Sequence, residues 1–185
     1  MKHIGTKTLE TERLLLRKTI DEDCEYMFCN WANDARVTKY LTWSPYESAQ
    51  QLRDTYHAYL LESQEKPDFY DWKIALKETR EPIGSIGVVG IREDVAEAEI
   101  GYCLGCRWWH QGIMTEALRA VIQFLFKEVG FNRITAKHDV NNPHSGGVMK
   151  NAGMQYEGTN RQAGINQQGI CDIATYAILK QDYFR

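Results

Sequence analysis

The chain has 185 residues, which is within the usual size of one domain and long enough to bury a substantial core. Hydrophobic residues make up 43% and charged residues 25%, as in ordinary globular proteins, so a disordered chain is excluded. The formal net charge is −3 with both signs interspersed, and no basic stripe is present that could neutralise nucleic-acid phosphates. We therefore expect a single domain over residues 1–185 that binds no nucleic acid.

The N-terminal sequence, MKHIGTKTLETERLLL, lacks the continuous apolar segment of a signal peptide. No stretch approaches the roughly 18 apolar residues that a membrane span needs. We therefore expect a cytoplasmic protein with no membrane partner.

Five cysteines, an odd number, favour reduced thiols over a disulfide framework. Cys103 and Cys106 form a CxxC pair, which zinc and redox sites use. A zinc site would need further ligands, and the chain contains no second CxxC and no HxxxH. A redox pair would stand at the start of a helix, whereas GCRWWHQG separates this pair from the next helical pattern. We expect ordinary thiols and no metal ion.

The first half of the chain begins with a short apolar run, Arg13–Lys18, that predicts a strand. Residues 19–22, TIDE, have the form of a capping box and predict a helix to about Trp31, with Thr19 and Glu22 as its reciprocal partners. Ser48 opens a second helix, in which four large residues recur at helical spacing: Leu52, Tyr56, Tyr59 and Leu60.

The second half alternates strands with two helices. The helix from Thr115 to Gly130 carries one apolar face, formed by Leu118, Val121, Ile122, Leu125, Phe126 and Val129. A shorter helix covers residues 145–153. Strands are predicted at residues 71–76, 82–91, 97–105, 133–140 and 170–179. This mixed order predicts a three-layer α/β fold.

The stretch WWHQGIMTEALRAVI leads from the predicted strand 97–105 through Gln111 and Gly112 into the N-terminus of a helix. Unpaired N–H groups and the helix dipole favour an anion there, and glycine lets a ligand approach the backbone. A glycine that serves only to form a turn before the helix would give the same sequence pattern. The GxxxxGK[ST] and GxGxxG motifs are absent, which argues against ATP and NAD.

Several segments, in the same order along nearly the whole chain, resemble the GCN5-related N-acetyltransferases (GNAT), and most closely their RimJ/RimL-type ribosomal-protein branch. The segments are LETERLLLR, AEIGYCLG, WHQGIMTEA, NPHS followed by KNAGM, and DIATYAIL. The resemblance implies a mixed, mostly antiparallel sheet of about seven strands with a central splay, flanked by about four helices. It also implies transfer of the acetyl group of acetyl-CoA to a primary amine. A homodimer is common in the family, although no pattern in this sequence requires one.

The resemblance also implies which residues hold acetyl-CoA. Its pyrophosphate would contact the backbone amides of the loop and first helical turn, its pantetheine arm would lie along the end of a strand, and Asn142 would bond to that arm. The loop residues are Gln111, Gly112, Ile113, Met114 and Thr115, and the strand residues are Tyr102, Cys103 and Leu104. Ser145 would lie near the thioester sulfur, although it could equally N-cap the helix that follows.

The chemistry needs a base, because a primary amine is mostly protonated at neutral pH, and an acid for the departing thiolate. Glu99 is the preferred base because it lies on the strand beside the cofactor. A salt bridge is the alternative role for this carboxylate. Ser145 is the preferred acid. Lesser candidates are Glu97, Tyr102 and His138.

The acceptor site would be lined by the first helices and by a loop at residues 159–169, with Trp31, Tyr40 and Trp43 as aromatic walls. A protein or peptide N-terminal amine is the first choice of acceptor. A small amine, such as a polyamine, an amino acid or an antibiotic, is the second. A protein that binds acetyl-CoA without transferring it, as a sensor, is the non-enzymatic alternative.

Three features depart from the family pattern. His110 and Met114 stand where small residues are common, so their bulk could narrow the pyrophosphate site. Gly146 and Gly147 place two glycines in a predicted helix, at a cost of about 1 kcal/mol each relative to alanine. Gly164 falls where some members of the ribosomal branch carry an acidic residue.

Overall fold

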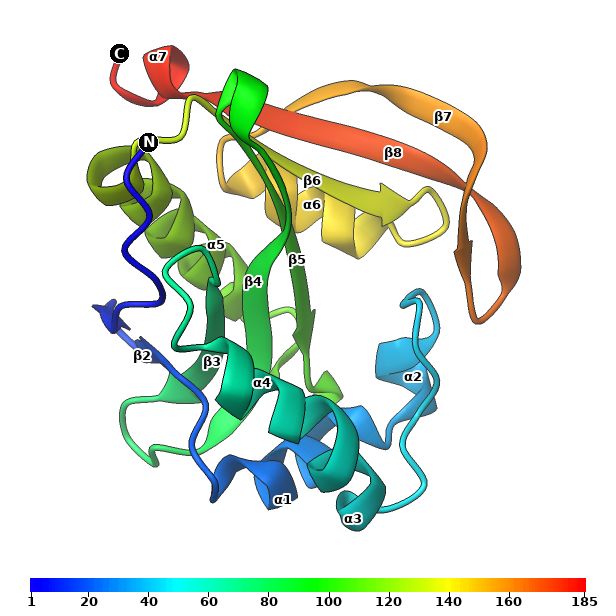
Figure 1. Cartoon of the computed structure of the whole chain (residues 1–185). Helices are drawn as coiled ribbons and strands as arrows, with labels where there is room; N and C mark the ends of the chain where they lie inside the picture. The colour runs from blue at the N-terminus through cyan, green and yellow to red at the C-terminus, as the bar shows by residue number, and fades with distance from the viewer.

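Eight strands form one sheet, in the spatial order β1-β2-β3-β4-β5-β6-β8-β7. The computed structural model describes all residues from 1 to 185 (Figure 1). Neighbouring strands are antiparallel except β5 and β6. The predicted mixed, mostly antiparallel sheet is confirmed, with one strand more than the resemblance implied. The strands are β1 (Leu9–Glu10), β2 (Leu14–Arg17), β3 (Asp71–Leu76), β4 (Pro82–Arg92), β5 (Glu97–Leu104), β6 (Arg133–Asp139), β7 (Gln155–Asn166) and β8 (Gly169–Leu179).

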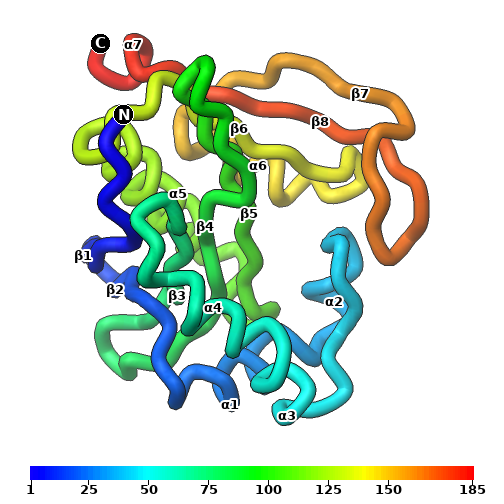
Figure 2. The backbone as a smooth tube through the Cα atoms, viewed as in Figure 1, coloured from blue at the N-terminus to red at the C-terminus, as the bar shows by residue number.

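Helices lie on both faces of this sheet (Figure 2). As the sequence predicts, Ser48 N-caps α3, because its side chain accepts the Gln51 N–H at 3.1 Å. Wider π-helical turns continue α1 to Ala32, link α3 to α4, and continue α5 to Val129. No helix is both long and apolar enough to span a bilayer. The helices are α1 (Asp23–Met27), α2 (Ala35–Thr38), α3 (Ala49–Leu52), α4 (Ala58–Ser63), α5 (Ile113–Phe124), α6 (Pro143–Asn151) and α7 (Lys180–Tyr183).

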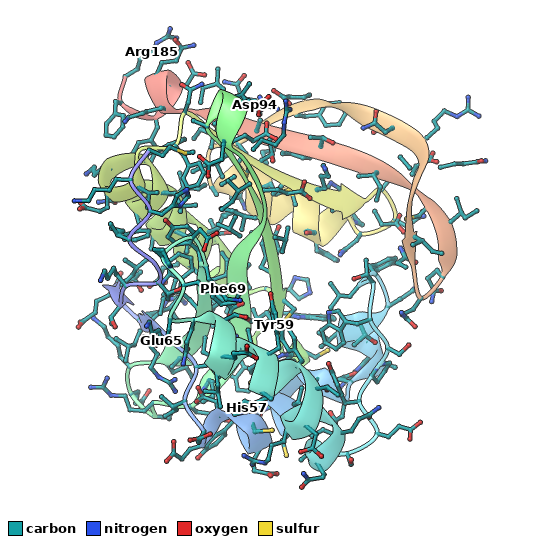
Figure 3. The ribbon with its side chains drawn as sticks, in the orientation of Figure 1. His57, Tyr59, Glu65, Phe69, Asp94 and Arg185 are labelled. Carbon is teal, nitrogen blue, oxygen red and sulfur yellow. The ribbon has the colours of Figure 1, made fainter.

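Each face of the sheet has its own hydrophobic core, because successive residues of a strand point to opposite faces. The larger core contains 28 buried residues and includes the apolar face of α5. The smaller core contains 7 buried residues under α1 and the α3–α4 segment, and Cys103 packs against it. The α3–α4 segment is attached by two further contacts. His57 Nε2 lies 3.0 Å from the Ile20 carbonyl oxygen, and Tyr59 packs edge-on against Phe69 (Figure 3). The predicted three-layer arrangement is therefore confirmed.

Strands β5 and β6 separate part-way along their length. Their parallel pairing runs from Glu97 with Arg133 to Ile100 with Ala136, and then stops. Both strands continue, β5 to Leu104 and β6 to Asp139, without pairing to each other. The gap is the central splay that the family resemblance implies. It leaves one edge of β5 open to an extended ligand.

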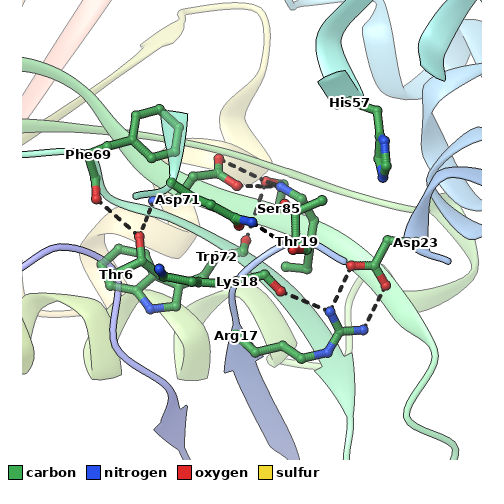
Figure 4. A network of polar contacts seen from close by, with 12 residues as sticks. Thr6, Arg17, Lys18, Thr19, Asp23, His57, Phe69, Asp71, Trp72 and Ser85 are labelled. Atoms are coloured by element: carbon green, nitrogen blue, oxygen red, sulfur yellow. Dashed lines mark hydrogen bonds and ion pairs between the residues drawn. The ribbon is translucent and has the colours of Figure 1, made fainter. Parts of the chain in front are cut away.

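The predicted capping box at residues 19–22 is wrong. The helix begins at Asp23, and Glu22 makes no side-chain capping bond. The Asp23 carboxylate instead accepts the Ile20 N–H at 2.9 Å and both ends of the Arg17 guanidinium at 2.7 Å (Figure 4). A buried, bidentate charge pair is stronger than a neutral hydroxyl cap, so Asp23 and not Thr19 fixes the start of α1.

The predicted acceptor loop at residues 159–169 is mostly a strand, and this prediction is also wrong. Strand β7 covers Gln155–Asn166 and pairs with β8, with Ile165 opposite Ile170. β7 is an edge strand, and none of its 12 side chains is buried on either face of the sheet. Its sequence therefore lacks the apolar alternation that identifies a strand.

The two glycines of α6, Gly146 and Gly147, differ in their surroundings, so we expect alanine to have opposite effects at the two positions. A Cβ at Gly146 would lie 2.6 Å from Nε2 of His138, which is buried, whereas a Cβ at Gly147 would meet nothing within 4 Å. We expect Gly146→Ala to lower the free energy of unfolding by about 1–3 kcal/mol through overpacking. Gly147→Ala should raise it by about 0.5–1 kcal/mol through helix propensity. Urea unfolding of both variants checks this, and equal effects would contradict the close packing.

Candidate active site

Five consecutive backbone N–H groups, from Gln111 to Thr115, donate no hydrogen bond within the protein. They follow β5 after a short turn at Cys106–Trp108 and include the first turn of α5. The first helical bond runs from Glu116 N–H to Gly112 O at 3.0 Å, so the N–H groups before it have no intrahelical partner. Such groups and the positive end of the helix dipole attract a phosphate. The loop therefore has the geometry of an anion site.

Arg13, in the turn between β1 and β2, holds this loop in place. Its Nη1 donates to Gln111 O at 2.9 Å, and its Nη2 pairs with Glu116 Oε2 at 2.7 Å. Glu116 also accepts the Thr11 hydroxyl at 2.6 Å, and these hydrogen bonds lower the pKa of its carboxyl against the opposing effect of burial. Sequence reasoning did not assign Arg13 a role, because its partner Gln111 is 98 positions away and no local pattern links them.

The two bulky residues of the loop lie in different environments. Met114 is only 5% exposed and packs into the larger core, so its bulk does not occupy the surface where a phosphate would bind. His110 is exposed, and its ring meets the His144 ring edge-on with centroids 4.7 Å apart. Its φ is 60°, a left-handed conformation that costs a non-glycine residue about 1–2 kcal/mol. Of the two residues that depart from the family pattern in this loop, His110 and not Met114 is therefore the one that affects the site.

A groove of about 790 Å³ begins at the loop and follows the exposed side of α5. Gly112 and Thr115 lie at one end, and Asn151 and Tyr183 are also among its lining residues. Arg119 supplies a cation within it, although its Nη2 already donates to Asn151 O at 2.5 Å. The groove is mostly polar, and it is large enough to hold the outer part of an extended ligand whose phosphates sit at the loop.

Tyr102 and Ser145 meet on one side of the splay. The Tyr102 hydroxyl donates to Ser145 O at 3.0 Å and lies 3.0 Å from Ser145 Oγ. Burial raises the pKa of Tyr102, so its hydroxyl is protonated at neutral pH. Asn142, not Ser145, is the N-cap residue of α6, and its side-chain amide makes no hydrogen bond within the protein. Ser145 and Asn142 therefore have polar groups available beside the gap.

The two carboxylates of β5 have different partners. Glu97 accepts Arg133 Nε at 2.6 Å, and Arg133 also pairs with Glu157 of β7, so Glu97 belongs to a structural ion-pair network. Glu99 accepts Lys137 Nζ at 2.6 Å and keeps a half-buried side chain. By strand alternation, Glu99 and Tyr102 point to opposite faces of β5. A carboxylate and a pair of hydroxyl groups thus lie on opposite faces of β5.

Cys103 lies on the same face as Glu99, above a buried polar cluster. Burial raises the pKa of its thiol to about 11, even though Lys73 lies nearby. Lys73 is fully buried, and its ammonium donates to Asp71 and, at 2.7 Å, to Ser85 Oγ (Figure 4). No group of three or more His, Cys, Asp and Glu side chains is placed to hold a metal ion. Cys103 is therefore a neutral thiol with no metal partner.

The aromatic residues predicted for the acceptor site are not equivalent. Trp31 is 2% exposed and lies within the smaller core, so it presents no open surface. Tyr40 and Trp43 are half-buried on the segment after α2. That segment reaches the β7–β8 turn, where Ser44 Oγ donates to Gln167 Oε1 at 2.9 Å. The segment after α2 and the β7–β8 hairpin therefore lie against each other on the side predicted for the acceptor.

Comparison with known proteins identifies the family. Residues 13–155 match the acetyltransferase (GNAT) domain. The chain belongs to the GNAT family of acetyltransferases. It is 34% identical over 180 residues to an uncharacterised N-acetyltransferase, p20, of Bacillus licheniformis, covering 96% of this chain and 98% of that protein. It is 25% identical over 161 residues to the ribosomal protein uS5-alanine N-acetyltransferase of Escherichia coli, covering 81% and 79% of the two chains.

The fold of this acetyltransferase agrees with that assignment. The crystal structure of the ribosomal-protein-S5-alanine acetyltransferase from Vibrio fischeri superposes with a TM-score of 0.83 at 18% identity, covering 96% of this chain and 98% of that one. The microcin C7 self-immunity acetyltransferase MccE, solved with acetyl-CoA and AMP, gives a TM-score of 0.78 at 21% identity, covering 91% and 93%. The predicted family, its RimJ/RimL-type resemblance and acetyl-CoA as cosubstrate are confirmed.

Proposed function

We propose that this acetyltransferase moves the acetyl group of acetyl-CoA to the N-terminal amine of a protein or peptide. The run of five free N–H groups from Gln111 to Thr115 carries the proposal, because it offers a pyrophosphate site where the splay opens. The 25% identity to the uS5-alanine enzyme of Escherichia coli supports a protein acceptor. A cytoplasmic location and a homodimer remain part of this proposal.

The residues beside the gap would hold the cosubstrate along its length. The amides of Gln111 to Thr115 would bind the pyrophosphate. The free edge of β5 at Tyr102, Cys103 and Leu104 would bond to the pantetheine amides as an added strand would. The unpartnered side chain of Asn142 would complete the pantetheine contacts. Bound acetyl-CoA supplies an activated acyl group as a thioester.

Direct transfer needs one proton removed and one delivered. Glu99 would take a proton from the amine, directly or through water, as nitrogen bonds to the acetyl carbon. Ser145 would donate the proton that the departing sulfur accepts as the C–S bond breaks, with Tyr102 held against its Oγ. The raised pKa of Cys103 keeps its thiol protonated, which disfavours an acetyl-cysteine intermediate. The amine would therefore attack the thioester itself.

A small amine is the second candidate acceptor. The Ser44–Gln167 hydrogen bond joins the α2 segment to the β7–β8 turn across the acceptor side. A peptide would need these two segments to stay apart, whereas a small amine would fit with the bond intact. We expect Ser44→Ala to raise kcat/KM for peptides if the acceptor is a peptide, and to leave it unchanged for small amines.

A CoA-release assay over N-terminal peptides and small amines tests the proposed function. We expect acceptor-dependent release with at least one peptide bearing a free N-terminus, and none with the same peptide acetylated. Release with small amines alone would overturn the protein acceptor. Calorimetric binding of acetyl-CoA without release on any amine would instead indicate a non-catalytic sensor.

Gly112 gives a separate test of the cofactor loop. Its φ is 72°, and an added Cβ would meet only Arg13 Nη2 at 3.7 Å, so backbone strain and not space opposes a side chain. We expect Gly112→Ala to lower the free energy of unfolding by about 1–2 kcal/mol. The tilted amides should also weaken acetyl-CoA binding about tenfold. Thermal unfolding and calorimetry check both effects. Unchanged affinity for acetyl-CoA would show that the pyrophosphate does not bind at this loop.

A further inference from the structure

His110 and His144 come from the two segments that bound the splay. His110 lies in the loop after β5, immediately before the five free N–H groups. His144 lies in the first turn of α6, between Asn142 and Ser145. Their rings meet edge-on, 4.7 Å apart at the centroids and 78° between planes. The ring pair therefore spans the opening through which a ligand held at both ends must run.

Both rings are free to bind. Each side chain is exposed, and neither ring makes a hydrogen bond to any protein group. By contrast, His3, His57 and His138 each have a hydrogen-bond partner within the protein. His110 also keeps a left-handed φ of 60°, a conformation that glycine adopts without strain. A strained non-glycine residue at a ligand site is a recognised sign of a functional role.

The charges around the ring pair leave the site open to an anion. On the loop side, Arg13 is paired with Glu116, and Arg107 lies over the Trp108 ring. On the α6 side, the carboxylate of Asp139 accepts from Asn141 and Asn166, which with its other hydrogen bonds lowers its pKa against burial. Lys150 lies near the other end of α6. No carboxylate forms a hydrogen bond or an ion pair with either imidazole, so no direct carboxylate contact opposes an anion at the rings.

We propose that His110 and His144 form a clasp on the pyrophosphate of acetyl-CoA. The rings part, and each donates an imidazole N–H to a phosphate oxygen beside the amides of the loop. This inference rests on the proposed function, because it places the pyrophosphate at that loop. A protonated imidazole makes a charge-assisted hydrogen bond, and histidine changes charge near neutral pH. A charged imidazole binds a phosphate oxygen more strongly than a neutral one, so we expect affinity for the cosubstrate to decline as pH rises.

Calorimetry with acetyl-dephospho-CoA at pH 6 and pH 8 tests the clasp. This ligand keeps the pyrophosphate but lacks the phosphate monoester, whose second pKa of about 6 would confuse the comparison. We expect binding about tenfold tighter at pH 6 than at pH 8. Acetyl-pantetheine, which has no phosphate, should bind with an affinity that does not change between the two values. Equal pH dependence for the two ligands would overturn the clasp.

Two variants separate the clasp from a general effect on folding. His110→Gly relieves the left-handed strain, so it should raise the melting temperature of the free protein while weakening acetyl-dephospho-CoA binding at pH 6 about threefold to tenfold. Arg80→Gly is the matched control, because Arg80 has a φ of 61° in the β3–β4 turn. It should also raise the melting temperature, with no change in affinity.

His144→Ala should likewise remove part of the pH dependence, and the double variant His110→Gly with His144→Ala should abolish it. If both single variants bind as the wild type does at pH 6, the clasp is wrong and the proposed function stands. If the wild type binds no acetyl-CoA at either pH, the proposed function itself fails.

Discussion

Replacing Ser145 with alanine is expected to lower kcat about 100-fold, the smaller end of the range for removing a general acid. The expectation follows from the position of Ser145 in the first turn of α6, where its Oγ lies 3.0 Å from the Tyr102 hydroxyl beside the splay. Because this hydroxyl would act on the departing sulfur and not on bound acetyl-CoA, KM for acetyl-CoA should change by about threefold at most. Steady-state CoA release with a good amine acceptor measures both constants.

Two further variants control for this result. Ser145→Thr keeps a hydroxyl and should retain most of the activity. Tyr102→Phe removes the group that positions Ser145, and we expect a smaller loss in kcat of about tenfold. If Ser145→Ala keeps kcat within about twofold of the wild type, the proton comes from another group.

Replacing Lys73 with methionine is expected to lower the free energy of unfolding by about 3–5 kcal/mol. The Lys73 side chain is fully buried, and its ammonium donates to both Asp71 and Ser85. Methionine matches the length of the side chain but leaves the Asp71 carboxylate, 13% exposed, without its counter-charge. For a chain of this size the loss should lower the melting temperature by about 6–20 °C. Differential scanning calorimetry and urea unfolding measure the two quantities.

Lys77→Met is the matched control, because the Lys77 side chain is 36% exposed and pairs at 3.1 Å with Glu10, whose side chain is 66% exposed. Its loss should cost less than about 1 kcal/mol. The double variant Lys73→Met with Asp71→Asn removes both charges and should recover part of the stability that Lys73→Met alone loses. A Lys73→Met loss no larger than that of Lys77→Met would contradict a buried ion pair.

Local sequence patterns predicted the elements in which the spacing of apolar residues reflects which side chains are buried. The apolar face of α5 contains Leu118, Val121 and Ile122, all fully buried, and the turn at Gly112 precedes it as the spacing indicates. The cap at Ser48 was also readable, because a capping bond joins residues three apart. The splay and the cofactor were predicted from the family resemblance, because the spacing of apolar residues gives no information about either.

The predictions that failed, and the contacts that no local pattern indicated, depend on partners distant in sequence. Strand β7 is an edge strand with exposed faces, so its residues show no alternation. The start of α1 is fixed by the pair between Asp23 and Arg17 of β2, which takes the role expected for Thr19. From the strand sequence DWKIAL alone, Lys73 would be expected to be a solvent-exposed charge. Its burial is explained only by the hydrogen bond to Ser85, which lies opposite it on β4.

The separation of β5 from β6 has a mechanical consequence. The four residue pairs from Glu97–Arg133 to Ile100–Ala136 are the only strand pairing between the half-sheet β1–β5 and the half-sheet β6–β8–β7. A pantetheine arm bonded into the gap would act as a temporary strand between them. A ligand that binds only the folded protein at about 100 times its Kd raises stability by about 2.7 kcal/mol. Each turnover would then join the two half-sheets more firmly and, on product release, loosen them again.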